Sequence, residues 1–256
     1  TSMNRLVPAF PTDIPQLSSK NFVSWHDVDF SGYLSIYSLF NFAQETAWKH
    51  AEDLGFGFEK LGTQNLAWVL FGMRIKMIST LPKWQEELII QTQPKGISGM
   101  FANRDYRMLN AQNQLIAIGS SNWVIIETET RRPQRLDHVF DSLRFSEQVE
   151  NLVSRLKPRR EFPFLLNTYK VKTSDIDYYG HVNNAKYIAW ISDLYTPEEL
   201  KNFPLDEILV NFLQETRFGD EVEIFADKKE NNGKVRYKMQ RKNDEKIILL
   251  AEADWK

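Results

Sequence analysis

Hydrophobic side chains recur at helical spacing in two separate stretches of the chain. In the first stretch they stand three or four positions apart, the pattern of a helix with one face on a core. These positions are Ile36, Leu39, Phe40, Ala43, Ala47, Ala51 and Leu54. Ser35 is a good N-cap for this helix, and Gly55 suits the residue just past its end. The pattern therefore predicts a helix over 36–54.

A shorter helix is predicted in the second half. Either Asn183 or Asn184 caps its start, and Pro197 is expected to end it. Its apolar positions are Tyr187, Trp190, Ile191 and Leu194.

Apolar and alternating runs around both helices predict strands, separated by turn residues such as Asn232-Gly233. One short strand precedes each helix, at 21–28 and 167–173. Four follow each helix, at 68–77, 87–93, 101–109 and 115–128, and at 208–215, 221–228, 234–241 and 246–255. A strand, a helix and four hairpin-linked strands predict an antiparallel sheet wrapped around one central helix. The fold class expected is α+β, a tandem (double) hotdog.

The two halves also resemble each other in sequence. Asp29-Phe30-Ser31-Gly32-Tyr33-Leu34-Ser35 matches Asp177-Tyr178-Tyr179-Gly180-His181-Val182-Asn183, 148 positions further on. The stretch 117–123, which ends in Trp123, matches 249–255, which ends in Trp255, 132 positions further on. Two matches in the same order predict a duplication, and much of the difference in spacing is expected in the longer first helix and the loop after it. We expect domains at 1–140 and 161–256, joined by a helical linker at 141–160.

Composition removes several function classes. A net charge of −2 gives no positive field for nucleic acid or an anionic membrane. The absence of cysteine excludes a thiol nucleophile, a disulfide framework and a cysteine-based zinc site. No apolar run reaches the ~18 residues of a membrane span. The first ten residues do not resemble a signal or transit peptide, so a cytoplasmic location is expected.

Reactive residues gather at the start of the second helix. His181 stands four positions after Asp177, and a carboxylate at that place can orient an imidazole for proton transfer. A helix start also offers unpaired N–H groups that can polarise an acyl carbonyl and hold an oxyanion. The first copy has Tyr33 and Ser35 where the second has His181 and Asn183, so the second site is the candidate.

Glu215 lies at the end of the strand-like run 208–215. A carboxylate there can activate water or attack a thioester, although the residue alone favours the interpretation of a solvated edge-strand glutamate.

The remaining motifs point to little else. His26, His50 and His138 have no ligand-like neighbours in sequence, and there is no phosphate-binding glycine loop or Gly-x-Ser-x-Gly turn. Basic residues cluster at 131–135 and 157–160, either as a solvated turn and linker or as a dock for an acidic carrier protein.

Two stretches resemble the signatures of the plant and bacterial acyl-ACP thioesterases. One is Asp175-Ile176-Asp177-Tyr178-Tyr179-Gly180-His181-Val182-Asn183-Asn184-Ala185-Lys186-Tyr187-Ile188, and the other is Trp123-Val124-Ile125-Ile126-Glu127-Thr128-Glu129-Thr130-Arg131-Arg132-Pro133. The likeness extends from about Asn21 to the end of the sequence, and the absence of a transit-peptide pattern resembles bacterial members.

The resemblance implies hydrolysis of fatty acyl-ACP to free fatty acid, with acyl carrier protein as partner and neither cofactor nor metal. The catalytic residues implied are Asp177, His181 and Glu215. Tyr179 stands where the family has an asparagine, and Thr216 where plant members have a cysteine. Substrate is expected to contact Tyr179, the helix start at Asn183 and Asn184, and a tunnel in the first domain lined by Trp68, Phe71 and Met73.

Three other activities fit the same residues. An acyl-CoA thioesterase uses this fold and these groups, and a hotdog dehydratase or hydratase also combines histidine with a carboxylate. A catalytically impaired acyl-binding protein is the third, since Tyr179 departs from the family pattern. A homodimeric assembly also stays open.

Overall fold

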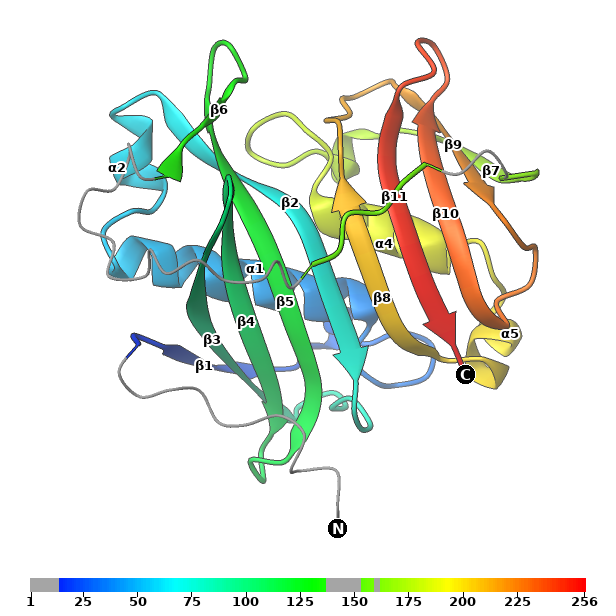
Figure 1. Cartoon of the computed structure of the whole chain (residues 1–256). Helices are drawn as coiled ribbons and strands as arrows, with labels where there is room; N and C mark the ends of the chain where they lie inside the picture. Colours follow the sequence, from blue (N-terminus) through cyan, green and yellow to red (C-terminus); the bar gives the residue numbers. More distant parts are fainter. Residues whose placement is uncertain (1–13, 137–152, 159–161) are drawn as a thin grey trace.

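The structure, a computed structural model, describes residues 14–136, 153–158 and 162–256. These residues form one antiparallel sheet of eleven strands. Figure 1 shows two similar halves side by side, each with one main helix against the same side of the sheet, α1 (Ile36–Asp53) in the first and α4 (Asn184–Ser192) in the second. The tandem hotdog predicted from the sequence is confirmed.

The first half runs from β1 to β6. Its other elements are β1 (Leu17–Phe22), α2 (Phe58–Gly62), β2 (Leu66–Met77), β3 (Glu87–Ser98), β4 (Phe101–Asn110), β5 (Leu115–Glu127) and β6 (Pro133–Gln134). The second half has β7 (Phe164–Lys170), α5 (Pro197–Asn202), β8 (Leu205–Phe212), β9 (Glu221–Ala226), β10 (Gly233–Arg241) and β11 (Ile247–Trp255).

Sheet topology establishes the duplication. The first half orders its strands β1-β3-β4-β5-β2, and the second orders the corresponding strands β7-β9-β10-β11-β8. The registers agree as well, because Tyr106 pairs with the residue four positions before Trp123, and Tyr237 with the residue four positions before Trp255. Because α1 has 18 residues and α4 only 9, the length difference expected in the helix is also confirmed.

The halves join where β2 pairs with β8, from Gly72 opposite Asn211 to Lys76 opposite Glu207. Asn211 is fully buried and ties the linker to this joint. Its Oδ1 accepts from the backbone amide of Leu156 at 2.6 Å, and its Nδ2 donates to the carbonyl of Ser154 at 3.2 Å. Most of the predicted linker helix lies outside the described residues, and the described part, 153–158, is not helical.

The helix ends follow their predicted caps, with one correction. Ser35 Oγ accepts from the amide of Ser38 at 3.1 Å, and Gly55 has φ of 79° at the end of α1. Asn183, not Asn184, caps α4, accepting from the amide of Ala185 at 3.0 Å. Pro197 does not end this helix: α4 stops at Ser192, and Pro197 begins α5 because Thr196 and Glu199 form a capping box there.

Several strand boundaries differ from prediction, and the physical reason is clear at three strand ends. β1 ends at Phe22, because Ser24 and Asp27 form a capping box that turns the chain into a short 3₁₀ helix. β7 ends at Lys170, before a matching 3₁₀ turn at Thr173–Asp175. β8 ends at Phe212, because the amides of Leu213 and Gln214 both donate to the carbonyl of Ile248. Glu215 therefore lies beyond the strand, in the loop that follows it.

A buried polar cluster connects α1 to the sheet in the first half. Arg104 Nη1 on β4 donates to His50 Nδ1 at 2.9 Å and to Thr92 Oγ1 at 3.2 Å. Burial lowers the pKa of His50 to about 4, helped by the charge of Arg104 and opposed by Asp53. A neutral imidazole thus accepts a hydrogen bond from a buried cation.

His50 should make stability depend on pH on the acid side. Its pKa is lowered in the folded chain, so its contribution is complete above the ordinary value of 6.5 and is lost as pH falls towards about 4. We expect the unfolding free energy of the natural protein to fall by about 3 kcal/mol more than that of His50→Gln over this interval. Urea unfolding of both proteins at several pH values measures this difference, and parallel pH curves would contradict the assignment.

Candidate active site

The turn between the 3₁₀ helix at Thr173–Asp175 and α4 sets the position of His181. The amide of Asp177 donates to the carbonyl of His181 at 2.8 Å, and Gly180, with φ of 77°, closes the turn. The carboxylate of Asp177 accepts from the backbone amides of Tyr179 at 2.9 Å and His181 at 3.3 Å. Asp177 therefore fixes the backbone that carries the imidazole, rather than holding its ring through a hydrogen bond.

The imidazole of His181 contacts the carboxylate of Glu215. Nε2 lies 3.2 Å from Oε2, and the side chains are 18% and 34% exposed respectively, so the pair is open to solvent on the carboxylate side. The loop of Glu215 is tied to the turn of His181, because the amide of Val182 donates to the carbonyl of Thr216 at 2.9 Å. Thr216 is itself buried and accepts a hydrogen bond from the hydroxyl of Tyr187. The structure thus brings together two predicted residues that are 34 positions apart in sequence.

The first half contributes a residue to this pair. Arg131, in the tight turn between β5 and β6, forms an ion pair with Glu215 Oε1 through Nη2. Figure 1 shows this hairpin at the same end of the sheet as the turn before α4. Arg131 adopts φ of 59°, which is uncommon for a residue with a side chain. In the sequence, Arg131 was noted only as part of a basic cluster. The one signal that connected it to the active site was its place in the second stretch that resembles the thioesterase signatures.

The surroundings of His181 favour its neutral form. Burial lowers its pKa, the charges of Arg217 and Arg131 lower it further, and Asp177 acts in the opposite direction. Near neutral pH the imidazole is therefore uncharged, and its contact with Glu215 is that of a neutral N–H donor with a carboxylate acceptor.

Two other predicted site residues connect the helices of the two halves. Asn183 Nδ2 donates to Asn41 Oδ1 at 3.5 Å, while its own Oδ1 caps α4. Asn184 Nδ2 donates to Gln44 Oε1 at 3.3 Å. Their side chains thus join α1 to α4. The backbone amide of Asn184, in the first turn of α4, has no acceptor among the described residues.

The corresponding place in the first half lacks the reactive pair. Its turn is built in the same way, with the amide of Asp29 donating to the carbonyl of Tyr33 at 3.0 Å. Tyr33 replaces the histidine. The hydrogen bonds on either side of Glu215 recur in the first half, where two successive amides donate to the carbonyl of Ile116 and the carbonyl of Pro82 accepts from an amide of the turn. Between these bonds, at the place of Glu215, stand Thr80 and Leu81. Neither side chain can accept a proton from water, so only the second copy retains acid–base groups at this position.

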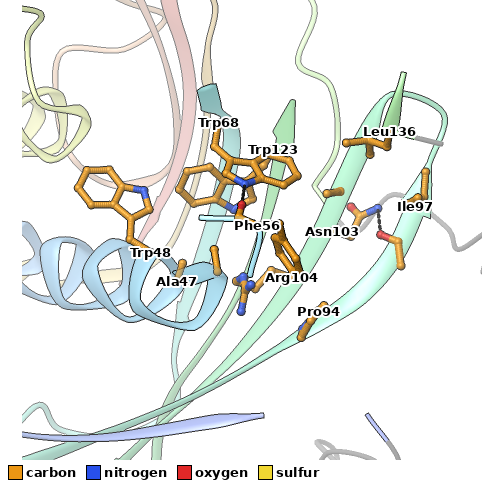
Figure 2. Close-up of a pocket in the computed structure, with 13 residues that line it drawn as sticks. Ala47, Trp48, Phe56, Trp68, Pro94, Ile97, Asn103, Arg104, Trp123 and Leu136 are labelled. Atoms are coloured by element: carbon orange, nitrogen blue, oxygen red, sulfur yellow. Dashed lines mark hydrogen bonds between the residues drawn. The ribbon is translucent and has the colours of Figure 1, made fainter. Parts of the chain in front are cut away.

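An apolar pocket lies in the first half, between the end of α1 and strands β2 to β5. Figure 2 shows Trp48, Trp68, Trp123 and Phe56 on its wall, with the indole Nε1 of Trp68 donating to the carbonyl of Phe56 at 2.9 Å. Of the three residues expected to line a tunnel in this domain, Trp68 lines the pocket. The other two candidates, Phe71 and Met73, are not among the lining residues.

Aromatic rings extend from this pocket towards the turn of His181. Phe58, two residues after Phe56, packs edge-on against Tyr179, with ring centroids 5.8 Å apart. Tyr179 is half exposed, and its pKa is raised by burial first and then by the charge of Asp177. The phenol therefore stays protonated and can donate a hydrogen bond.

Within the described ranges no group of histidine, aspartate and glutamate side chains is arranged to hold a metal ion. In the same ranges, no helix combines the length and apolar character needed to cross a bilayer.

Because the chain contains two hotdog domains, it falls in the class of tandem hotdog proteins. Its histidine–glutamate pair lies at the start of the main helix of the second domain. The chain belongs to the acyl-ACP thioesterase family: residues 16–142 match the acyl-ACP thioesterase N-terminal domain, and residues 160–256 match the C-terminal domain.

Individual relatives agree with this assignment. The chain is 26% identical, over 80% of its length, to the chloroplastic oleoyl-acyl carrier protein thioesterase 2 of Arabidopsis thaliana. It spans about 60% of the length of that curated relative. An acyl-ACP thioesterase structure from Bacteroides thetaiotaomicron matches with a TM-score of 0.82 and 26% identity, covering 94% of this chain and 98% of that one. The 12:0-ACP thioesterase of Umbellularia californica, at 18% identity and a TM-score of 0.77, shares the fold, with 94% of this chain and 97% of that chain covered.

Removing the charge of Arg131 should raise the pKa of His181. In Arg131→Gln one of the two nearby cations is lost, so protonation of the imidazole becomes easier and its titration moves to higher pH. NMR titration of the histidine ring protons measures the shift. Arg132→Gln, at the next position in the same turn, is the matched control and should leave the titration unchanged. A pKa that falls or stays constant in Arg131→Gln would show that Arg131 does not act on the site.

Proposed function

We propose that the protein hydrolyses the thioester of fatty acyl-ACP and releases a free fatty acid. The observation that carries the proposal is the 3.2 Å contact between His181 and Glu215 at the start of α4. It lies in a chain of this family that also has an apolar pocket in its other half.

In the proposed mechanism Glu215 acts as the general base. Its carboxylate takes a proton from water, the water oxygen attacks the thioester carbonyl carbon, and the carbon–sulfur bond breaks. The proton held by Glu215 then passes to the thiolate, so that free acid and thiol are formed. Arg131 contacts one oxygen of Glu215 and His181 contacts the other, so the carboxylate is held in one orientation. In the proposal a water molecule beside this carboxylate, rather than the carboxylate itself, attacks the thioester.

The remaining predicted residues have supporting roles. The amide of Asn184 and the positive end of α4 stabilise the negative charge that develops on the carbonyl oxygen. Asp177 holds the backbone turn and adds negative charge beside the imidazole. Tyr179 donates a hydrogen bond to the carrier arm or the carbonyl, and the side chain of Asn183 holds the start of α4 in place.

The acyl chain occupies the pocket of the first half, with Trp68 on its wall. Burial of each methylene contributes ~0.8 kcal/mol, so the tryptophan and aliphatic side chains of the pocket wall support binding of a fatty chain. In this proposal residues 1–140 supply the acyl pocket and residues 161–256 supply the catalytic groups. Acyl carrier protein is the partner, and a cytoplasmic location and a homodimer stay predictions from the sequence.

Loss of either reactive side chain should abolish most of the activity. His181→Ala and Glu215→Ala are each expected to lower kcat by about 10²–10⁴-fold, the range typical of a lost acid–base group. Steady-state release of free thiol from acyl-ACP measures the effect, with circular dichroism to check the fold. Tyr33→Ala, at the matching position of the first half, is the control and should keep its activity. Natural turnover in either site variant would refute the assignment.

The carrier is identified by presenting the same acyl group in two forms. With acyl-ACP and acyl-CoA of equal chain length, we expect kcat/KM to be higher for acyl-ACP. A preference for acyl-CoA would identify the alternative thioesterase, and unsaturated product without free thiol would identify a dehydratase. An acyl group that stays intact on both carriers would identify a binding protein.

A further inference from the structure

The acyl pocket contains a cation that the proposed hydrolysis does not use. Arg104 is 7% exposed, and its guanidinium lies on the pocket wall among tryptophan and aliphatic side chains. Figure 2 shows Arg104 reaching from β4 towards the end of α1. A charged group in such surroundings is costly unless it is paired and hydrogen-bonded.

Arg104 has no anionic partner within the described ranges of the chain. Both of its hydrogen bonds use Nη1 and go to uncharged acceptors, His50 and Thr92. Nε and Nη2 have no acceptor in those ranges. Lys95 and Asp105 pair with each other, and Asp53 acts on His50 without reaching hydrogen-bonding distance of Arg104. Three of the five N–H donors of the guanidinium are therefore left for another group.

The fold does not require a cation at this position. The strand registers show that Tyr106 on β4 and Tyr237 on β10 occupy equivalent positions of the two halves. Two residues before each tyrosine, the equivalent residues are Arg104 in the first half and Val235 in the second. Val235 is completely buried in an apolar core. The same sheet position thus holds a valine within the apolar core of the second half and an arginine on the pocket wall of the first.

We infer that the pocket selects acyl chains that carry an oxygen acceptor near their far end, and that Arg104 binds this oxygen. The inference rests on the proposed function, because it assigns the pocket to the acyl chain. A hydroxyl, a keto group or a carboxylate shares the required chemistry, an oxygen lone pair facing N–H donors in an apolar site. An unsubstituted chain fills the pocket and leaves those donors without an acceptor.

The test compares unsubstituted acyl-ACPs with acyl-ACPs of the same length bearing a terminal hydroxyl, keto or carboxyl group, across a series of chain lengths. At the length that reaches Arg104, we expect kcat/KM to be about tenfold or more higher for an oxygenated chain, the effect of a hydrogen bond to a charged donor. Arg104→Met should remove or invert this preference and improve the unsubstituted substrate. The control is Arg107→Met, in the same strand and outside the pocket, which should retain the preference.

A binding measurement separates this inference from the proposed hydrolysis. Calorimetric titration of the full chain with a fatty acid and with its terminally hydroxylated form gives their affinity ratio without any turnover. Absence of thioester hydrolysis together with tighter binding of the hydroxylated acid would refute the proposed function and support the role of Arg104. The inference is refuted if the natural protein binds and hydrolyses every oxygenated chain no better than the unsubstituted chain of the same length. This outcome does not depend on whether Arg104→Met folds.

Discussion

The antiparallel pairing of β2 with β8 is the constraint on which the rest of the structure depends. It turns two sheets into one and removes an open edge from each half. It also brings α1 and α4 together, so that the amide side chain of Asn184 reaches Gln44. A third consequence is that the β5–β6 turn of the first half lies beside the reactive loop of the second. Arg131 can reach Glu215 only because the two sheets are in this register.

The two halves use the same fold for different purposes. In the second half the interior is filled, with Tyr195, Tyr237 and Trp255 hydrogen-bonded to one another under a short helix. In the first half α1 is twice as long, and its last turns stand away from the sheet to leave a pocket beside Trp123. A tight core leaves no space for a ligand, and a pocket leaves fewer contacts to hold reactive groups rigidly. Division between two copies meets both needs.

Much of this architecture follows from local signals. The apolar stripe ending at Gly55 and the repeat around Asp177 predicted the helices and the duplication, because periodicity and caps are encoded within a few residues. Strand ends were less accurate, since the end of β8 depends on two amides that share the carbonyl of Ile248, far away in sequence. The pairing of Arg131 with Glu215 could not be derived from spacing at all, because it arises from tertiary contact across the joint between domains.

The charges at the site explain why both halves are needed. An isolated histidine–glutamate pair would favour the imidazolium, because a carboxylate at 3.2 Å stabilises the protonated ring. Burial of the ring opposes this charge first, the charges of Arg217 and Arg131 lower the pKa of His181 further, and Arg131 also pairs with the carboxylate. The result is an imidazole whose pKa is lowered although it lies beside a carboxylate. Arg131 belongs to the first half, so the contact between the two copies contributes to the protonation state of the site.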